Sequence, residues 1–254
     1  MNIYANAIKT NMLISFLTVA MVLAVLTVPN EVQAQVKKGE IIIGKNIEGY
    51  ISLVPITCSL YRNDNRLALE GLAEGIRTFT RVTPSLDQNI KLDDQRVVKY
   101  PFLYVSTGGK YSDFELLGTE QKSLGRYLKS GGFVLLEFDI IAYRGLKSML
   151  PQDIRLKPVP DSHSIYHEPF DIDTTSWNNL VSNRLGDGLS ADLPVGAYLM
   201  GLYYKGKLVG VYSDKNVGAW NRRLGGGANP INTNIKFGIN MINYATKMYN
   251  EKNK

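Results

Sequence analysis

The sequence predicts an α/β fold, and three observations lead to that prediction. Residues 102–106 and 133–138 are nearly continuous apolar runs, as expected for strands buried on both faces of a sheet. Residues 119–130, between them, have the apolar spacing and the terminal residues of a helix. A strand, a helix and a second strand in this order form a βαβ unit, in which the two strands are parallel. We therefore expect a mostly parallel sheet with helices on both faces.

The chain of 254 residues begins with a segment typical of a signal peptide. Residues 12–28 carry no charge, follow Lys9, and fall short of the roughly 20 apolar residues that span a bilayer comfortably. Small residues precede an expected cleavage site after Ala34. We expect residues 1–34 to be removed, and the protein to be periplasmic or extracellular. An uncleaved segment would be its only contact with a membrane. Residues 35–50 are then a variable opening, and residues 51–250 form one domain.

The first elements of that domain are a strand and an amphipathic helix. Residues 51–57 predict a strand, in which Pro55 indicates an edge or a strand end, and Cys58 follows directly. Residues 65–80 have apolar side chains at helical spacing, after asparagine and aspartate residues that can cap the start. Gly71 and Gly75 lie one turn apart in this helix, which predicts a close approach to the strands.

A short extended piece at residues 81–83 should end at Pro84 and lead into a polar connection. In the helix at residues 119–130, we expect Thr119 to cap the start, and Glu120 and Lys129 to complement the dipole at the two ends. Gly131 should stop the helix in a left-handed conformation.

The C-terminal part predicts irregular structure, then a hairpin and a closing helix. Residues 151–194 are rich in Asp, Asn, Ser and Pro, so loops with short strands are expected. Residues 197–204 and 207–213 alternate as strands do, and Lys205-Gly206 between them is a turn requiring positive φ. A helix should start at Asn232 or Thr233 and run to about Asn250. Its apolar face consists of Ile235, Ile239, Ile242 and Ala245.

Charge and cysteine content narrow the class of protein. The net charge of +6 is spread over the chain, with no run of Lys and Arg longer than two. Together with export, this makes nucleic acid an unsuitable partner. Cys58 is the only cysteine, so no disulfide can form within the chain. Its simplest role is that of a small core side chain.

Four segments spread over the chain carry a resemblance to known sequences: YPFLYVSTGG (100–109), RYLKSGGFVLLEFD (126–139), PDSHSIYHEPFDI (160–172) and GINMINYATK (238–247). In this order they resemble a bacterial family catalogued as domain of unknown function 4159. Members of this family look like class I glutamine amidotransferase folds. The resemblance implies a flavodoxin-like, doubly wound sheet, export or membrane tethering, and no established activity.

The chain departs from these relatives at two places and from the amidotransferases at a third. It has His163-Ser164 where the family tends to have His-Pro, and Glu137-Phe138-Asp139 where adjacent acidic residues are usual. It also has no Gly-x-Cys-x-Gly turn, which holds the nucleophilic cysteine of catalytic amidotransferases. The resemblance therefore argues against glutaminase chemistry.

Polar residues follow the carboxyl ends of several expected strands, where open α/β sheets bind ligands. The candidate ligand-binding residues lie after the two buried strands: Ser106, Thr107, Gly108, Gly109, Glu137 and Asp139. A hydroxyl beside two glycines could hold an anionic or carbonyl group. The alternative is a tight turn with a structurally bonded carboxylate.

His163 and His167 are the only histidines, and Asp161, Glu168 and Asp171 lie near them. The prolines around this cluster oppose a helix, and no second group of ligands has a recognisable spacing, so we predict neither a metal site nor a cofactor. Turn-stabilising hydrogen bonds are the expected role, with one histidine acting as a catalytic base as the alternative.

Three functions remain open on these grounds. The first is an exported, non-catalytic domain that binds a partner protein or a small ligand. The second is a hydrolase or amidase in which Cys58 or Thr107 is the nucleophile, His163 or His167 the base, and Asp139 or Glu168 the orienting group. The third is a carbohydrate-binding protein that uses Trp177 or Trp220 as a stacking face.

Overall fold

A computed structural model describes residues 48–60, 65–107, 115–138, 140–174, 199–213, 217–221 and 228–252. All of them belong to the second of two compact units, Lys38–Lys254. The expected signal peptide lies outside the described residues. None of the helices within them is long and apolar enough to cross a membrane.

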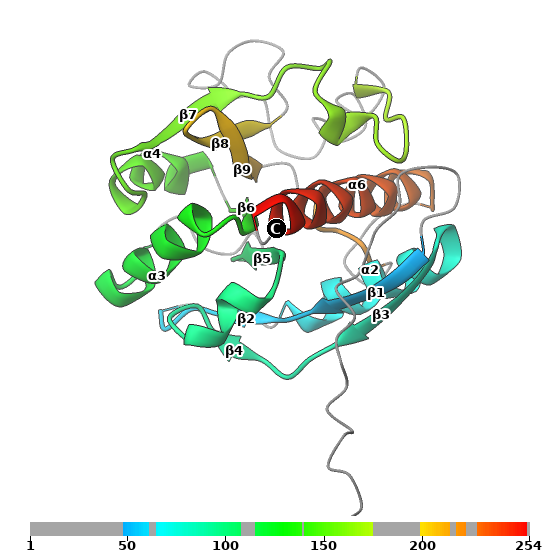
Figure 1. Ribbon diagram of the computed structural model, residues 1–254, viewed down its shortest axis with the longest axis horizontal. Helices are drawn as coiled ribbons and strands as arrows, with labels where there is room; N and C mark the ends of the chain where they lie inside the picture. Colours follow the sequence, from blue (N-terminus) through cyan, green and yellow to red (C-terminus); the bar gives the residue numbers. More distant parts are fainter. Residues whose placement is uncertain are drawn as a thin grey trace, which may run out of the picture. The chain divides into compact units, whose positions relative to one another are not determined.

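The described part is an α/β structure, as predicted (Figure 1). Its elements in chain order are β1 (Glu48–Leu53), β2 (Ile56–Thr57), α2 (Arg66–Phe79), β3 (Arg81–Leu86), β4 (Ile90–Lys91), the 3₁₀ helix η1 (Gln95–Lys99), β5 (Phe102–Ser106), α3 (Gly118–Lys129), β6 (Phe133–Glu137), α4 (Ile140–Met149), β7 (Ile154–Pro158), the 3₁₀ helix η2 (Ser164–Tyr166), β8 (Met200–Tyr204), β9 (Lys207–Ser213) and α6 (Ala228–Lys252).

The largest sheet has five strands in the order β5-β6-β9-β8-β7, and it is mixed. Strands β5, β6 and β9 are parallel, which confirms the βαβ unit, whereas β8 and β7 run antiparallel. The sequence analysis predicted a mostly parallel sheet and, in addition to it, the C-terminal hairpin. Instead, β9 pairs with β6, so the hairpin forms the middle of the sheet and brings an antiparallel half with it.

Two small parallel sheets, β1-β3 and β2-β4, complete the strand arrangement. A single bridge from Pro55 to Tyr104 connects the first segment to β5. In Figure 1 these small sheets lie on one side of β5, and β7, β8 and β9 lie on the other. Every residue of β5 and β6 is buried, so both faces of these central strands are covered.

Two prolines shape the first strands. The expected strand at residues 51–57 is divided into β1 and β2, because Pro55 has no N–H to donate at the break. The prediction that Pro84 ends the next strand was wrong, since β3 continues to Leu86 with Pro84 opposite Ile51. Within the described residues β3 pairs only with β1, so the missing N–H of Pro84 is tolerated there.

The glycines of α2 serve a different contact from the one we expected. A Cβ at Gly71 would lie 2.4 Å from the carbonyl oxygen of Trp220, and one at Gly75 would lie 2.2 Å from Cγ2 of Ile235 in α6. The close approach is therefore to α6 and to the segment before it, not to the strands.

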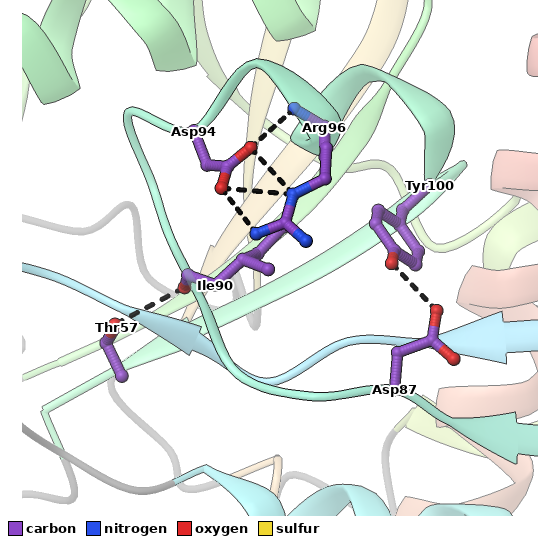
Figure 2. A network of polar contacts seen from close by, with 6 residues as sticks. All are labelled: Thr57, Asp87, Ile90, Asp94, Arg96 and Tyr100. Carbon is purple, nitrogen blue, oxygen red and sulfur yellow. Dashed lines mark hydrogen bonds and ion pairs between the residues drawn. The ribbon is translucent and has the colours of Figure 1, made fainter.

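Hydrogen bonds order the polar connection between β3 and β5 (Figure 2). The Asp94 carboxylate caps η1 by accepting from the backbone N–H of Arg96 at 2.8 Å. The same carboxylate forms an ion pair with the Arg96 guanidinium at 2.7 Å. The Tyr100 hydroxyl donates to Asp87 at 2.7 Å. Burial of the ring and this carboxylate raise the pKa of Tyr100 to about 12.

Helix α3 begins at Gly118, and Thr119 is not its cap. The Thr119 hydroxyl bonds to Asp93 at 3.2 Å, and the buried Glu120 carboxylate accepts from the Leu117 N–H at 3.0 Å. At the other end, Gly131 has φ of 89°, as the predicted stop requires. Lys129, in the last turn, forms an ion pair with Asp153 at 2.9 Å.

The C-terminal elements follow the prediction with shifted ends. Lys205 and Gly206 both have positive φ, 49° and 80°, which confirms the hairpin turn. Helix α6 starts at Ala228, four residues before Asn232. Its expected apolar face is buried throughout. Helix α4 and the position of β7 were not anticipated.

Candidate functional site

The carboxyl ends of the central strands bring several candidate residues together. Ser106 and Glu137 are register partners at the ends of β5 and β6, and Ser213 of β9 pairs with Glu137 on its other side. The Thr107 N–H donates to the Glu137 carbonyl oxygen at 3.2 Å. The structure thus places Ser106, Thr107 and Glu137 side by side, and adds Ser213, which the sequence analysis did not consider. Candidates Gly108, Gly109 and Asp139 lie outside the described residues.

Glu137 is a buried carboxyl group with two hydrogen-bond partners. Its Oε2 accepts from the Gly218 N–H at 2.6 Å, and its Oε1 accepts from the Tyr104 hydroxyl at 3.3 Å. Burial raises the pKa of Glu137 to about 7, because the charged form loses its hydration, and the two hydrogen bonds oppose that rise. Near neutral pH this side chain therefore exists in both protonation states.

The segment after β9 closes over Tyr104. A Cβ at Gly218 would lie 2.2 Å from the Tyr104 hydroxyl oxygen, so only glycine permits this approach. The rings of Tyr104 and Trp220 lie 4.9 Å apart, and Trp220 Nε1 donates to the Asn234 carbonyl oxygen at 3.0 Å. Trp220 is therefore a core residue, which removes it as a stacking face for sugars. Trp177 lies outside the described residues.

Thr107 has a buried hydroxyl group for which no partner is visible. Only 1% of the residue is exposed, and its Oγ1 makes no hydrogen bond to any described residue. Buried hydroxyl groups in proteins are almost always bonded. The rim thus offers a buried hydroxyl without a described partner, on a residue whose backbone pairs with that of Glu137.

Cys58 follows β2, as predicted, but its environment is unfavourable for a nucleophile. The pKa of its thiol is raised to about 12, first by burial and then by the negative charges of Glu120 and Asp93. Glu120 is held in place because it also accepts from the Ser59 N–H at 2.6 Å. A thiolate is the reactive form of cysteine, so these surroundings keep Cys58 inert.

His163 lies toward the opposite end of the sheet from Thr107. Its ring contacts Tyr244 of α6 at 5.3 Å, and Tyr244 contacts Phe133, the first residue of β6, at 5.6 Å. Glu137 is four residues further along β6, about 13 Å at the usual rise of about 3.3 Å per residue. Nδ1 of His163 accepts from the Ile165 N–H at 3.2 Å, and burial lowers the pKa of this ring.

His167 is held by its own loop. Its Nδ1 is 2.6 Å from Asp171 Oδ1, and its Nε2 is 2.6 Å from the Asp161 carbonyl oxygen. The Asp171 hydrogen bond, followed by that of Asp161, raises the pKa of His167. Both histidines thus have the turn-stabilising contacts that the sequence analysis favoured.

The two C-terminal segments that resemble the family contact each other. Asn240 of α6 accepts from the Phe170 N–H at 3.0 Å and donates to the Phe170 carbonyl oxygen at 2.7 Å. Lys247 forms an ion pair with Glu168 at 2.5 Å. Glu168, a candidate orienting group for a histidine, is therefore paired with lysine instead. No cluster of three or more potential metal ligands occurs within the described ranges.

Comparison with known proteins identifies the family of the chain. No curated protein matches the chain. The model of the family described as "Domain of unknown function (DUF4159)" matches residues 58–246. This range begins before α2, ends within α6, and includes all the candidate residues named above. The chain therefore belongs to the family of domain of unknown function 4159.

Proposed function

We propose that this protein is an exported, non-catalytic α/β domain that binds a small ligand, or a side chain of a partner protein, at the carboxyl ends of its strands. The observation that carries the proposal is the buried Thr107 hydroxyl, which has no described partner and follows β5 at the strand-end rim. A small hydrogen-bonding group placed there would satisfy the Thr107 hydroxyl.

The surroundings of the candidate nucleophiles support binding over catalysis. A hydrolase needs a nucleophile and a base within hydrogen-bond reach. Cys58 is kept protonated, and no hydrogen bond joins either histidine to Cys58 or Thr107 among the described residues. The enzyme alternative, with Cys58 or Thr107 and a histidine, would require a rearrangement that brings residues 160–172 away from α6.

Two further features belong to this proposal. The parallel strands β5, β6 and β9, with α3 crossing between the first two, support a flavodoxin-like arrangement with an antiparallel extension. Export rests on the apolar segment at residues 12–28 and the small residues before Gln35. Mass spectrometry of protein recovered from the producing cells should show a mature chain that begins at Gln35, and a retained Met1 would contradict cleavage.

The binding site is tested by removing one hydroxyl group. A panel of small carboxylic acids, amides and polyols is screened by thermal shift against the wild type and Thr107→Val, which has nearly the same shape. We expect ligands that stabilise the wild type to lose their effect on this variant. The matched control is Thr78→Val on the exposed side of α2, where the Thr78 hydroxyl donates to the Glu74 carbonyl oxygen, and this change should leave binding unchanged.

Two outcomes would overturn the proposal. One is a set of ligands that stabilise Thr107→Val as well as the wild type. The other is turnover of an ester, amide or glycoside that disappears in Thr107→Val or in His163→Ala, which would establish the enzyme alternative.

A further inference from the structure

A shallow hollow of about 650 Å³ lies between the edge strand β7 and the turn of the β8-β9 hairpin. Arg155 and Lys157 of β7 and Lys205 of the turn line it, and all three are exposed. Its single carboxylate, Asp153, is paired with Lys129 at 2.9 Å. The hollow therefore carries a surplus of positive charge.

A second hollow of about 640 Å³ adjoins it along α3. Lys122, Arg126 and Lys129 line this hollow together with Asp93, and the Lys129 ion pair with Asp153 joins it to the first hollow. Gly125 lets α3 pack closely on the segment before β7, since a Cβ there would lie 2.7 Å from the ring of Pro151. The two hollows thus lie next to each other, because α3 packs on the segment before β7.

Six exposed cations form what we call the basic belt: Lys122, Arg126, Lys129, Arg155, Lys157 and Lys205. Only two carboxylates line the same hollows, so the belt has a surplus of four charges, whereas the whole chain has six. Of these cations, Arg155, Lys157, Lys122 and Arg126 form no ion pair with any described carboxylate. A row of cations over two adjoining open hollows suits an extended anion rather than a small one.

The first hollow also contains a flat aromatic surface. Tyr203 of β8 is half-buried and lies opposite Arg155 in the strand register. Its ring lies over Gly201, where a Cβ would be 2.5 Å from Cε2 of the ring. Glycine at this position therefore lets the tyrosine lie along the sheet, next to Lys157, which is the register partner of Gly201.

We propose that the basic belt binds an acidic polysaccharide. Carboxylate or sulfate groups would pair with the cations, and an apolar face of one sugar ring would pack on Tyr203. Two tyrosines line the first hollow, and the cations Lys129 and Lys205 lie over the ring of the second, Tyr204. The choice of polysaccharide over nucleic acid therefore rests on the exported location in the proposed function, outside the compartment in which nucleic acid is the common polyanion. The belt is separate from the rim at Thr107, and neither site needs the other.

The proposal is tested with fluorescently labelled polygalacturonate oligosaccharides and the purified protein. Uncharged dextran and a single-stranded DNA of equal charge are the competing probes. We expect saturable binding of polygalacturonate that weakens as salt rises, no binding of dextran, and weaker binding of DNA. The double reversal Arg155→Glu with Lys157→Glu should lower the affinity at least about tenfold, because each exposed charge contact contributes modestly and four charges change.

Two matched controls separate a site from general charge. Arg81→Glu with Lys99→Glu makes the same charge change at exposed positions outside the belt, and should alter the affinity by less than about twofold. Tyr203→Leu should weaken polygalacturonate about fivefold without changing its salt dependence, whereas Tyr203→Phe retains the ring and the affinity. Circular dichroism checks that each variant is folded.

Any of three results would overturn the inference: no binding of polygalacturonate, equal or tighter binding of the DNA, or an equal loss in the control reversal. These outcomes are independent of the rim, since Thr107→Val should leave polygalacturonate binding unchanged. Failure of the belt and failure of the rim proposal are thereby distinguishable.

Discussion

At the scale of single residues, Glu137 has an unusual environment for a carboxyl group. It is buried at the end of β6, and the Gly218 N–H and the Tyr104 hydroxyl are its partners, neither of which carries a charge. A lone carboxyl group in this setting is more costly to ionise than one in water. Its protonation therefore depends on whether the chain is folded.

Glu137 should make stability depend on pH. Its pKa rises from 4.5 to about 7 on folding, so the folded chain holds the proton more tightly. The resulting stabilisation is fully present below pH 4.5 and is lost as pH rises to 7, a change on the order of 3 kcal/mol. Urea unfolding of Glu137→Gln, which cannot titrate here, should show this part of the pH dependence removed. An unchanged difference between variant and wild type from pH 5 to 8 would contradict the prediction.

Cys58 should be unreactive in the folded protein. Its raised pKa leaves almost no thiolate, and only 5% of the residue is exposed. We expect labelling by a disulfide reagent at pH 8 to be absent under native conditions and complete in denaturant. At intermediate denaturant concentrations, the labelling rate should follow the fraction of unfolded protein. Rapid labelling of the native chain would show that the surroundings of β2 open locally, and would restore Cys58 as a candidate nucleophile.

At the scale of elements, the sequence is most informative where a local rule is sufficient. The Lys205-Gly206 turn and the Gly131 stop depend on backbone conformations that few residues adopt, and both were predicted. The start of α3 was not, because Thr119 is turned to Asp93 of a distant segment, and Glu120 takes over the capping. Capping by Thr119 was a reasonable local expectation that tertiary contacts override.

The close packing of α2 can be tested with two glycines. Gly71→Ala places a Cβ 2.4 Å from a backbone oxygen, which cannot move aside as a side chain could. We expect a loss of about 2 to 3 kcal/mol in the free energy of unfolding. Gly118→Ala meets no atom within 4 Å in α3, and should cause no loss or a small gain. Equal stabilities of the two variants in urea denaturation would show that the contact with Trp220 does not constrain α2.

At the scale of the whole molecule, the order of the strands is what sequence patterns do not show. The two strands of the βαβ unit are adjacent in the chain, so their pairing could be predicted. The pairing of β9 with β6 joins segments about 75 residues apart in register, and no local pattern records it. The same distinction holds for the candidate site. Sequence patterns could predict that Ser106, Thr107 and Glu137 lie at one edge of the sheet, because they stand at the ends of strands that are paired. They could not predict the position of His163, because it depends on contacts with α6.

The docking of residues 160–172 on α6 gives a prediction at this scale. Asn240→Ala would leave the Phe170 N–H and carbonyl without their partners, at a cost of roughly 1 to 3 kcal/mol. We expect hydrogen exchange to rise mainly in residues 160–172, before global unfolding. The control is Asn89→Ala, because Asn89 is exposed and, among the described residues, accepts a hydrogen bond from Arg66 alone, so exchange in residues 160–172 should be unaffected. A uniform rise in hydrogen exchange over the whole chain would show that residues 160–172 do not open independently of the rest.

The place of β9 between β6 and β8 has a consequence for biosynthesis. Until residues 207–213 leave the ribosome, the apolar strand FVLLE of β6 has an unpaired edge of the kind that joins other chains. Chains that stop before residue 207 should therefore accumulate as insoluble aggregates, while those that extend through residue 252 remain dispersed. A nascent chain of this protein thus exposes this edge while the residues from the end of β6, at Glu137, to the end of β9, at Ser213, are synthesised.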